Sequence, residues 1–173
     1  YLLLHSFSPN KLTDNGFADL AAVPTDVLAQ VLLNHVISGS ISSTNLVDLG
    51  NGYTNSLATG AGTNAMSLYY NTDSGVVFNG ISTVVTADVV GTNGIIHAVD
   101  TVIGLPTVVT FAVADPNFST LVSALTNLTP ATDFAGILSR TATGNTDGID
   151  PDFTVFAPTN EAFADITVPT DEA

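Results

Sequence analysis

A domain-length internal repeat constrains the fold of this chain more than any other feature of its sequence. The phrase "GFADLAAVPTD" at residues 16–26 returns as "AFADITVPTD" at residues 162–171, about 145 residues later. That period is too long for a solenoid repeat and matches an ordinary domain. The first copy follows "FSPN" at residues 7–10, and the second follows "FAPTN" at residues 156–160. We therefore expect most of one unit followed by the beginning of another.

Composition indicates a globular protein that binds neither nucleic acid nor anionic lipid. The chain has 173 residues and is 45% hydrophobic, which permits a sizeable core. Two basic residues against 16 acidic ones give a net charge of −14, whereas phosphate backbones bind through Lys and Arg. The absence of cysteine excludes disulfides and cysteine zinc sites. No apolar run reaches the roughly 18 residues that cross a bilayer, so no membrane insertion is expected.

Helical spacing of apolar residues predicts three helices. They cover residues 24–37, 115–128 and 132–138. In the first, Pro24 suits the opening turn and Asp26 favours the positive end of the helix. In the second, Asp115 is a good N-cap and Pro116 a good first helical residue. A further helical turn is expected to start after Thr159.

Short β-strands are expected between these helices. They are predicted within 38–75 among turns, at 81–90, at 95–103 and at 153–158, with a loop over 141–152. Asn79-Gly80 is a strong hairpin signal, and a second Asn-Gly pair at 93–94 introduces the strand at 95–103. Because helices and strands do not alternate as regular β-α-β units, the pattern favours an α+β domain over a doubly wound sheet.

Four motifs together resemble the fasciclin (FAS1) family. They are "FTVFAPTNEAF" (153–163), "NGIIHAVDTVIGLP" (93–106), "LLNHVISG" (32–39) and "VADPNFSTLVSAL" (113–125). The resemblance implies an α+β fold: a wedge of two small β-sheets with several short helices packed alongside. Because the second signature precedes the intact first one, residues 1–106 resemble the later part of one unit and residues 107–173 the beginning of a unit.

The beginning of a unit would expose apolar surface unless something covers it. Three arrangements meet this need. The chain is one window on a tandem array, or residues 107–173 pack on 1–106 of the same chain, or each chain completes a neighbour head to tail. The array ranks first.

The resemblance also implies a set of structural signature residues. These are Phe153, Phe156, Pro158, Thr159, Asn160, Phe163, Asn93, Gly94, His97, Asp100 and His35. His35 matches a family histidine in a region linked to receptor recognition, so Asn34 and His35 are the candidate recognition residues, although asparagine replaces a tyrosine at position 34. From the residues themselves, bracing of the backbone is the favoured role for Asp100, Thr159 and Asn160.

The sequence contains little that supports catalysis or metal binding. The histidines at 5, 35 and 97 show no metal-ligand spacing, and buried structural histidines are favoured over ligands. Asp147, Asp150 and Asp152 form an oxygen-rich loop that suits Ca²⁺, but its spacing departs from the EF-hand, so a solvated acidic loop is favoured. No nucleophile elbow or phosphate-binding loop is present. We expect neither an enzyme nor a required cofactor.

The expected function is an extracellular or cell-surface adhesion or structural module. Its partners would be homotypic FAS1 units in a tandem array or a head-to-tail homo-oligomer, and further partners could be matrix glycans or surface proteins. The alternative is a carbohydrate- or small-ligand-binding surface module, which a large apolar pocket with convergent polar groups would favour.

Overall fold

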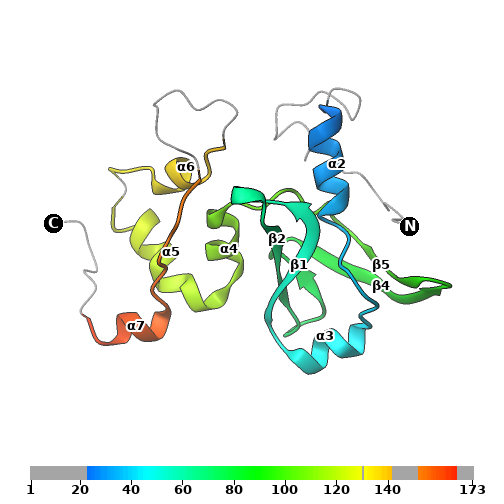
Figure 1. Ribbon diagram of the computed structural model, residues 1–173. Coiled ribbons are helices and arrows are strands. Elements are labelled where there is room, and N and C mark those ends of the chain that lie inside the picture. Colours follow the sequence, from blue (N-terminus) through cyan, green and yellow to red (C-terminus); the bar gives the residue numbers. More distant parts are fainter. Residues whose placement is uncertain (1–22, 130, 142–151, 167–173) are drawn as a thin grey trace. The chain divides into compact units, whose positions relative to one another are not determined.

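The chain forms two compact units, Tyr1–Leu105 (unit 1) and Pro106–Ala173 (unit 2). The structure is a computed structural model that describes residues 23–129, 131–141 and 152–166 (Figure 1). Within those ranges unit 1 combines short helices with a β-sheet, and unit 2 consists of short helices with connecting segments. The expected α+β class is confirmed.

The first described helix, α2 (Thr25–Leu33), is shorter than the sequence predicts. Its N-cap residue is Pro24, whose carbonyl accepts the Leu28 N–H, and it carries Asp26 in its first turn. The predicted continuation to residue 37 is wrong, because the chain turns away after Asn34 and becomes extended. Ile37 forms a β-bridge with Ser56, and the Val36 carbonyl accepts the Leu57 N–H.

The next helix, α3 (Ser43–Leu49), lies within the region where only turns and small strands were expected. Ser42 caps it: the Ser42 hydroxyl accepts the Asn45 N–H, and the Asn45 side chain accepts the Ser42 N–H. This reciprocal capping box normally carries Glu or Gln at the third helical position. Because Asn45 stands there instead, the sequence pattern did not indicate the start of a helix. The helix buries Leu46, which is 3% exposed, against the sheet.

The strands of unit 1 form one antiparallel sheet of five strands. They are β1 (Gly52–Thr59), β2 (Ala65–Asn71), β3 (Val77–Phe78), β4 (Ser82–Gly91) and β5 (Gly94–Val99), hydrogen-bonded in that order. A short 3₁₀ turn, η2 (Ala61–Thr63), joins the first two strands. The expectation of two small sheets is wrong for the described residues, because the short β3 pairs with both β2 and β4 and so makes the sheet continuous.

The predicted Asn-Gly hairpin is confirmed at Asn79-Gly80. Both residues have positive φ, 48° and 70°, and the Ile81 N–H closes the turn on the Phe78 carbonyl. This is the conformation that makes Asn-Gly favourable in tight hairpins. The buried Asn79 also bonds β2 through its side chain, which accepts the Tyr69 N–H at 3.0 Å.

The strand predicted at 95–103 is shorter than expected, because β5 ends at Val99. The Asp100 N–H still donates to the Thr83 carbonyl at 3.0 Å, and side chains supply further bonds to this segment. The Asp100 carboxylate accepts the Thr83 N–H at 2.8 Å. The fully buried Ser82 hydroxyl donates to the Thr101 carbonyl. We call residues 100–104 the exit segment. Side-chain hydrogen bonds hold this segment in place where the chain leaves the sheet.

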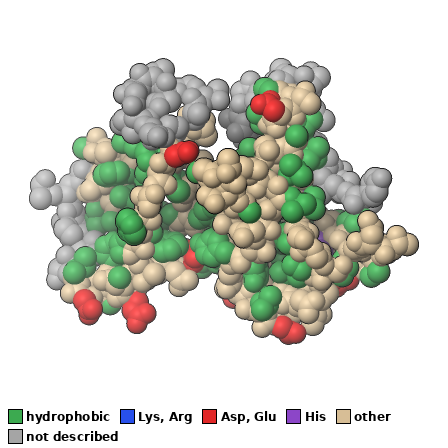
Figure 2. Space-filling model, viewed as in Figure 1, with side chains coloured by type: hydrophobic (Ala, Val, Ile, Leu, Met, Phe, Trp, Pro, Cys, Tyr) green, Lys and Arg blue, Asp and Glu red, His purple; other side chains and the backbone are tan. Residues whose placement is uncertain are grey.

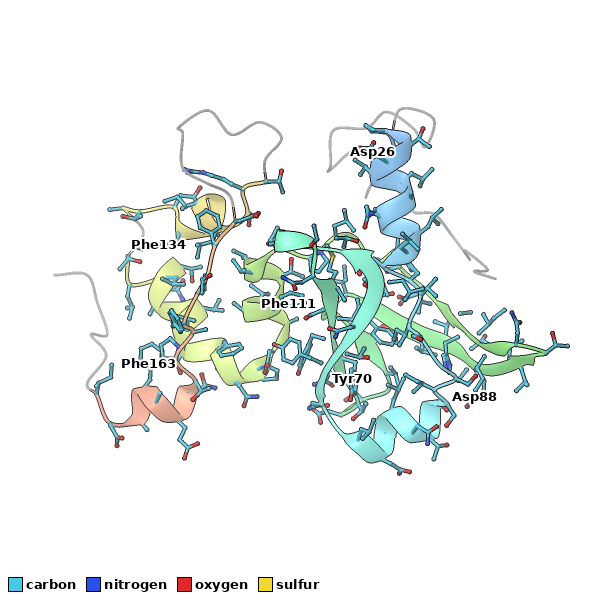
Figure 3. The ribbon with its side chains drawn as sticks, in the orientation of Figure 1. Asp26, Tyr70, Asp88, Phe111, Phe134 and Phe163 are labelled. Atoms are coloured by element: carbon cyan, nitrogen blue, oxygen red, sulfur yellow. The ribbon has the colours of Figure 1, made fainter. Side chains whose placement is uncertain are left out.

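Asp88 occupies an irregular position in β4 and ties the β4–β5 hairpin to α3. Its φ of 60° lies in the left-handed region and coincides with a shift of register against β5. The Ser43 N–H donates to its carboxylate at 2.9 Å, and the Ser43 hydroxyl donates to the other oxygen. Figure 3 shows Asp88 beside the start of α3. A carboxylate at that position is favoured by the positive end of the helix.

Among the described residues of unit 1, most of the buried apolar side chains form one cluster. It comprises Leu46, Leu68, Tyr70, Val76, Phe78 and Ile103. Val99 of β5 and Ile41 of the segment before α3 pack against it. The cluster thus joins α3, the middle of the sheet and the exit segment, as burial of apolar surface requires.

Unit 2 contains α4 (Val108–Ala114), η3 (Pro116–Phe118), α5 (Ser119–Thr126), α6 (Phe134–Leu138) and α7 (Asn160–Ala164). Asp115 caps η3 as predicted, by accepting the Asn117 N–H, but the predicted helix opens as a 3₁₀ turn and becomes α-helical at Ser119. Thr159 caps α7 as predicted. Phe111, Phe134 and Phe163 are the aromatic residues of α4, α6 and α7 that Figure 3 labels.

The strand predicted at residues 153–158 is absent from the described residues. The segment is extended but pairs with no strand there, and Phe156 is 92% exposed. A β-strand requires a partner, and the β-branched and aromatic pattern alone cannot supply one.

No single helix among the described residues has the length and apolar character to cross a membrane. Only α4 and the following η3–α5 together, bent by 96°, meet those two criteria. On the visible face, acidic side chains are scattered singly among hydrophobic and uncharged polar groups (Figure 2).

The Asp88–Ser43 contact predicts a specific pH dependence. The Ser43 hydroxyl and N–H lower the pKa of Asp88 from its ordinary value of 3.8. Its contribution to stability is therefore complete above pH 3.8 and is lost as the pH falls through the folded-state pKa. Urea unfolding measured from pH 5 downward should show a shallower loss of stability in Asp88→Asn than in the wild type.

Asp48→Asn, which alters a carboxylate further along α3, serves as the matched control and should keep the wild-type slope. Equal slopes for Asp88→Asn and the wild type would show that the contact contributes nothing.

Candidate functional site

The candidate recognition pair, Asn34 and His35, stands where α2 ends. Asn34 is the C-cap residue of α2 and donates its N–H to the Gln30 carbonyl. Both side chains then reach across unit 1 to the exit segment, some 70 residues later in the chain. We call this pair the clamp, because it joins the end of α2 to the last residues of unit 1.

Asn34 is the buried half of the clamp. Its side chain is 0% exposed; its amide nitrogen donates to the Gly104 carbonyl at 2.9 Å, and its oxygen accepts the Ser56 hydroxyl at 2.8 Å. Burying an amide is tolerated when its polar atoms find partners, as here. A binding partner could touch Asn34 only after unit 1 opened, so the visible role of this residue is bracing. Its role in recognition stays a prediction.

His35 forms the second half of the clamp. The Ile103 N–H donates to Nε2 at 2.9 Å, and Nδ1 lies 2.7 Å from the Val31 carbonyl. A neutral imidazole has one donor and one acceptor nitrogen, so these partners require the proton on Nδ1. Burial lowers the pKa of His35 below its ordinary 6.5, although the Val31 carbonyl acts in the opposite direction.

His97 repeats this arrangement on β5. Its Nδ1 accepts the Asp88 N–H at 3.3 Å, and its Nε2 lies 2.9 Å from the Ile41 carbonyl. The same reasoning places its proton on Nε2. His97 therefore links the β4–β5 hairpin to the segment before α3, as His35 links α2 to the exit segment.

Both imidazoles line one cavity of about 190 Å³ in unit 1. Its apolar walls include Ile37, Ile41, Leu46 and Phe78. Small-molecule sites usually measure about 300–1,000 Å³ and offer a few convergent polar groups. Here both nitrogens of each ring already contact the backbone, so the cavity offers little to orient a polar ligand.

Three other signature residues of unit 1 lie on or beside the β4–β5 hairpin. Asn93 and Gly94 stand at its tip, where Gly94 pairs with Gly91 and begins β5. Asp100 is exposed and bonds Thr83 from the exit segment. Of these three residues, Asp100 supports the backbone through its side chain, and Gly94 takes part in the strand pairing.

The signature residues of unit 2 gather around the start of α7. The Asn160 side-chain oxygen accepts the Thr120 N–H at 2.9 Å, and its nitrogen donates to the Pro116 carbonyl at 2.9 Å. The sequence had suggested that Asn160 ties the helix start to the segment before it. Instead, Asn160 ties α7 to the η3–α5 junction. Phe153 and Phe163 are partly buried, whereas Phe156 and Pro158 are exposed.

The proposed Ca²⁺ loop falls largely outside the described residues. Asp147 and Asp150 lie outside the described residues, whereas Asp152 is described and is exposed. Within the part of the chain that the structure describes, no three His, Asp or Glu residues gather closely enough to hold a metal ion. The Ca²⁺ loop stays a prediction.

Sequence reasoning missed the partners of the clamp. Ser56 belongs to no motif, and Gly104 lies in the motif at residues 93–106, which gives no sign of its partner; their contacts with Asn34 join residues that lie 22 and 70 positions apart. The only local signal was Asn34 itself, a polar residue directly after an apolar helical stripe.

The fold and these contacts can be set beside known proteins. The fasciclin domain model matches residues 7–106, so the chain belongs to the fasciclin family. The match starts at the "FSPN" copy of the repeat. No curated protein matches the chain. The fasciclin domain is a module generally associated with adhesion, typically non-catalytic and commonly extracellular.

Removing the buried amide of the clamp should destabilise unit 1. Asn34→Ala leaves the Gly104 carbonyl and the Ser56 hydroxyl without this partner, which costs about 1–3 kcal/mol for buried polar groups. Urea unfolding at neutral pH measures the loss. Asn55→Ala, at an exposed position of β1, is the control and should change stability by less than about 0.5 kcal/mol. Equal effects in the two variants would contradict the assigned role of Asn34.

Asn160→Ala should loosen α7 without unfolding unit 2. The variant loses the bonds to Thr120 and Pro116, each worth about 1 kcal/mol. Amide hydrogen exchange at Thr120 should therefore accelerate, whereas Glu161→Gln, at the next and exposed position, should leave it unchanged. Unchanged exchange in Asn160→Ala would refute the tie between α7 and α5.

Proposed function

We propose that this chain is an extracellular or cell-surface adhesion module that acts by homotypic, head-to-tail packing of fasciclin units. The contact joins the start of one unit, in residues 107–173, to a unit of the kind matched at residues 7–106. The covering unit belongs to a tandem array or to a second copy of the chain.

The exposed extended segment at residues 153–158 carries this proposal. Phe156 is 92% exposed and Val155 is 42% exposed, on backbone with no strand partner among the described residues. Burying a phenylalanine side chain contributes about 1.5–3 kcal/mol, so this segment gains by being covered.

The repeat supports a fasciclin unit as the covering partner. "FAPTN" at residues 156–160 is the second copy of "FSPN" at residues 7–10, where the fasciclin match begins. Residues 153–166 therefore correspond to the beginning of another fasciclin unit. The surface that accommodates such a beginning is one that fasciclin units themselves possess.

The charge distribution favours this segment as the contact. Copies that each carry a net charge of −14 repel one another, and residues 153–158 contain no charged side chain. Like-charge repulsion is weakest where two uncharged segments meet. Added salt should strengthen the association, because it screens the remaining carboxylates.

The alternative, a carbohydrate- or small-ligand-binding module, has less support. The cavity of about 190 Å³ is smaller than usual ligand sites, and its polar ring nitrogens already contact the backbone.

The test is the molar mass from light scattering over a dilution series. The wild type should show a mass that rises with concentration, and Phe156→Ser should remain monomeric to higher concentrations. Val113→Ser changes another exposed apolar residue of unit 2, 65% exposed on α4, and should follow the wild type. A wild type that is monomeric at every concentration would exclude a second copy as the covering unit, and a Phe156→Ser variant that associates as well as the wild type would contradict the proposed contact.

A further inference from the structure

We propose that His35 is an acid-sensitive latch: its protonation releases the exit segment, residues 100–104, from the end of α2. The exit segment leads directly into Leu105, the last residue of unit 1, and Pro106, the first residue of unit 2. The latch therefore sets how firmly the link between the two units is anchored in unit 1.

The geometry of His35 makes the latch depend on the neutral ring. Nε2 must accept the Ile103 N–H, and the Val31 carbonyl occupies Nδ1 as an acceptor. A protonated imidazole carries an N–H on both nitrogens and accepts nothing. Protonation thus places two donors, the Nε2–H of His35 and the Ile103 N–H, against each other at a contact that is 2.9 Å long with the neutral ring. Either the ring or the exit segment must move.

Among the residues that the structure describes, the lining of the cavity at His35 includes no carboxylate that would stabilise the protonated ring in place. The cavity residues beside it are apolar except for His97, which is itself titratable. Two carboxylates of the β4–β5 hairpin and the exit segment have other partners: Asp88 bonds Ser43 and its N–H donates to His97, and Asp100 bonds Thr83. Burial accordingly lowers the pKa of His35.

The sign of the effect follows from linkage. The released ring has the ordinary pKa of 6.5 and binds a proton more readily than the latched ring, whose pKa is lowered. Latching is therefore fully favourable above pH 6.5 and is progressively lost as the pH falls toward the lowered value. Since one proton is taken up, the opening equilibrium rises by at most about tenfold per pH unit.

Release differs from general unfolding because other bonds remain. The Asn34 amide still holds the Gly104 carbonyl, and Ser82 still holds the Thr101 carbonyl. The middle of β2, including the buried Tyr70, does not contact the ring nitrogens. We therefore expect the Ile103 amide to respond to acid before the Tyr70 amide does.

The experiment is amide hydrogen exchange of the full chain between pH 7 and pH 5, corrected for the intrinsic pH dependence of exchange. In the wild type, opening at Ile103 should increase by up to about tenfold per pH unit below 6.5, while Tyr70 stays protected. His35→Gln places an amide that accepts the Ile103 N–H but does not titrate, and its opening at Ile103 should be independent of pH.

His97→Gln is the matched control, because His97 lines the same cavity but contacts Asp88 and Ile41 instead of the exit segment. This variant should keep the acid response at Ile103. The latch is refuted if wild-type opening at Ile103 does not change with pH, if Tyr70 opens in parallel, or if His35→Gln responds as the wild type does. Should His35→Gln fail to fold, the wild type and His97→Gln still decide between these outcomes.

Discussion

The clamp between the end of α2 and the exit segment is the contact on which unit 1 depends most. Asn34 and His35 are neighbours in sequence, yet one holds the Gly104 carbonyl and the other the Ile103 N–H. Ile103 belongs to the apolar core, so the clamp fixes a core residue that no regular strand holds. The clamp lies where α2 ends: directly after Leu33, the Asn34 side chain and one ring nitrogen of His35 form contacts outside the helix.

Hydrogen bonds to the backbone, and not ion pairs, hold the described elements of unit 1 together. Two basic residues cannot pair with 16 carboxylates. Many long-range bonds of unit 1 come from amides, hydroxyls and imidazoles, as Asn79 and Ser82 show, and the carboxylates of Asp88 and Asp100 likewise accept backbone N–H groups. Such bonds are insensitive to salt, unlike surface ion pairs. Acid weakens the bonds that imidazoles accept, since an imidazole that accepts an N–H loses that capacity on protonation.

The sequence predicted the features that local chemistry determines. The Asn79-Gly80 turn and the caps at Asp115 and Thr159 depend on residues within a few positions of each other, and all three are present. The α3 helix escaped notice because Asn45 replaces the usual Glu or Gln of the capping box. Residues 153–158 have the composition of a strand, but pairing is a tertiary property that composition cannot supply. The clamp partners Ser56 and Gly104 were out of reach for the same reason.

Membership of the fasciclin family and the contacts of unit 1 together support an adhesive module in which small polar side chains hold short, irregular elements in place. In this module His35 is a neutral, bridging imidazole whose Nε2 accepts the Ile103 N–H. Nitrogen NMR of the imidazole rings at neutral pH tests this assignment. We expect the His35 ring to carry its proton on Nδ1, with a hydrogen-bond coupling between Nε2 and the Ile103 amide. A ring protonated on Nε2, or one that exchanges freely between the two tautomers as in water, would contradict this assignment.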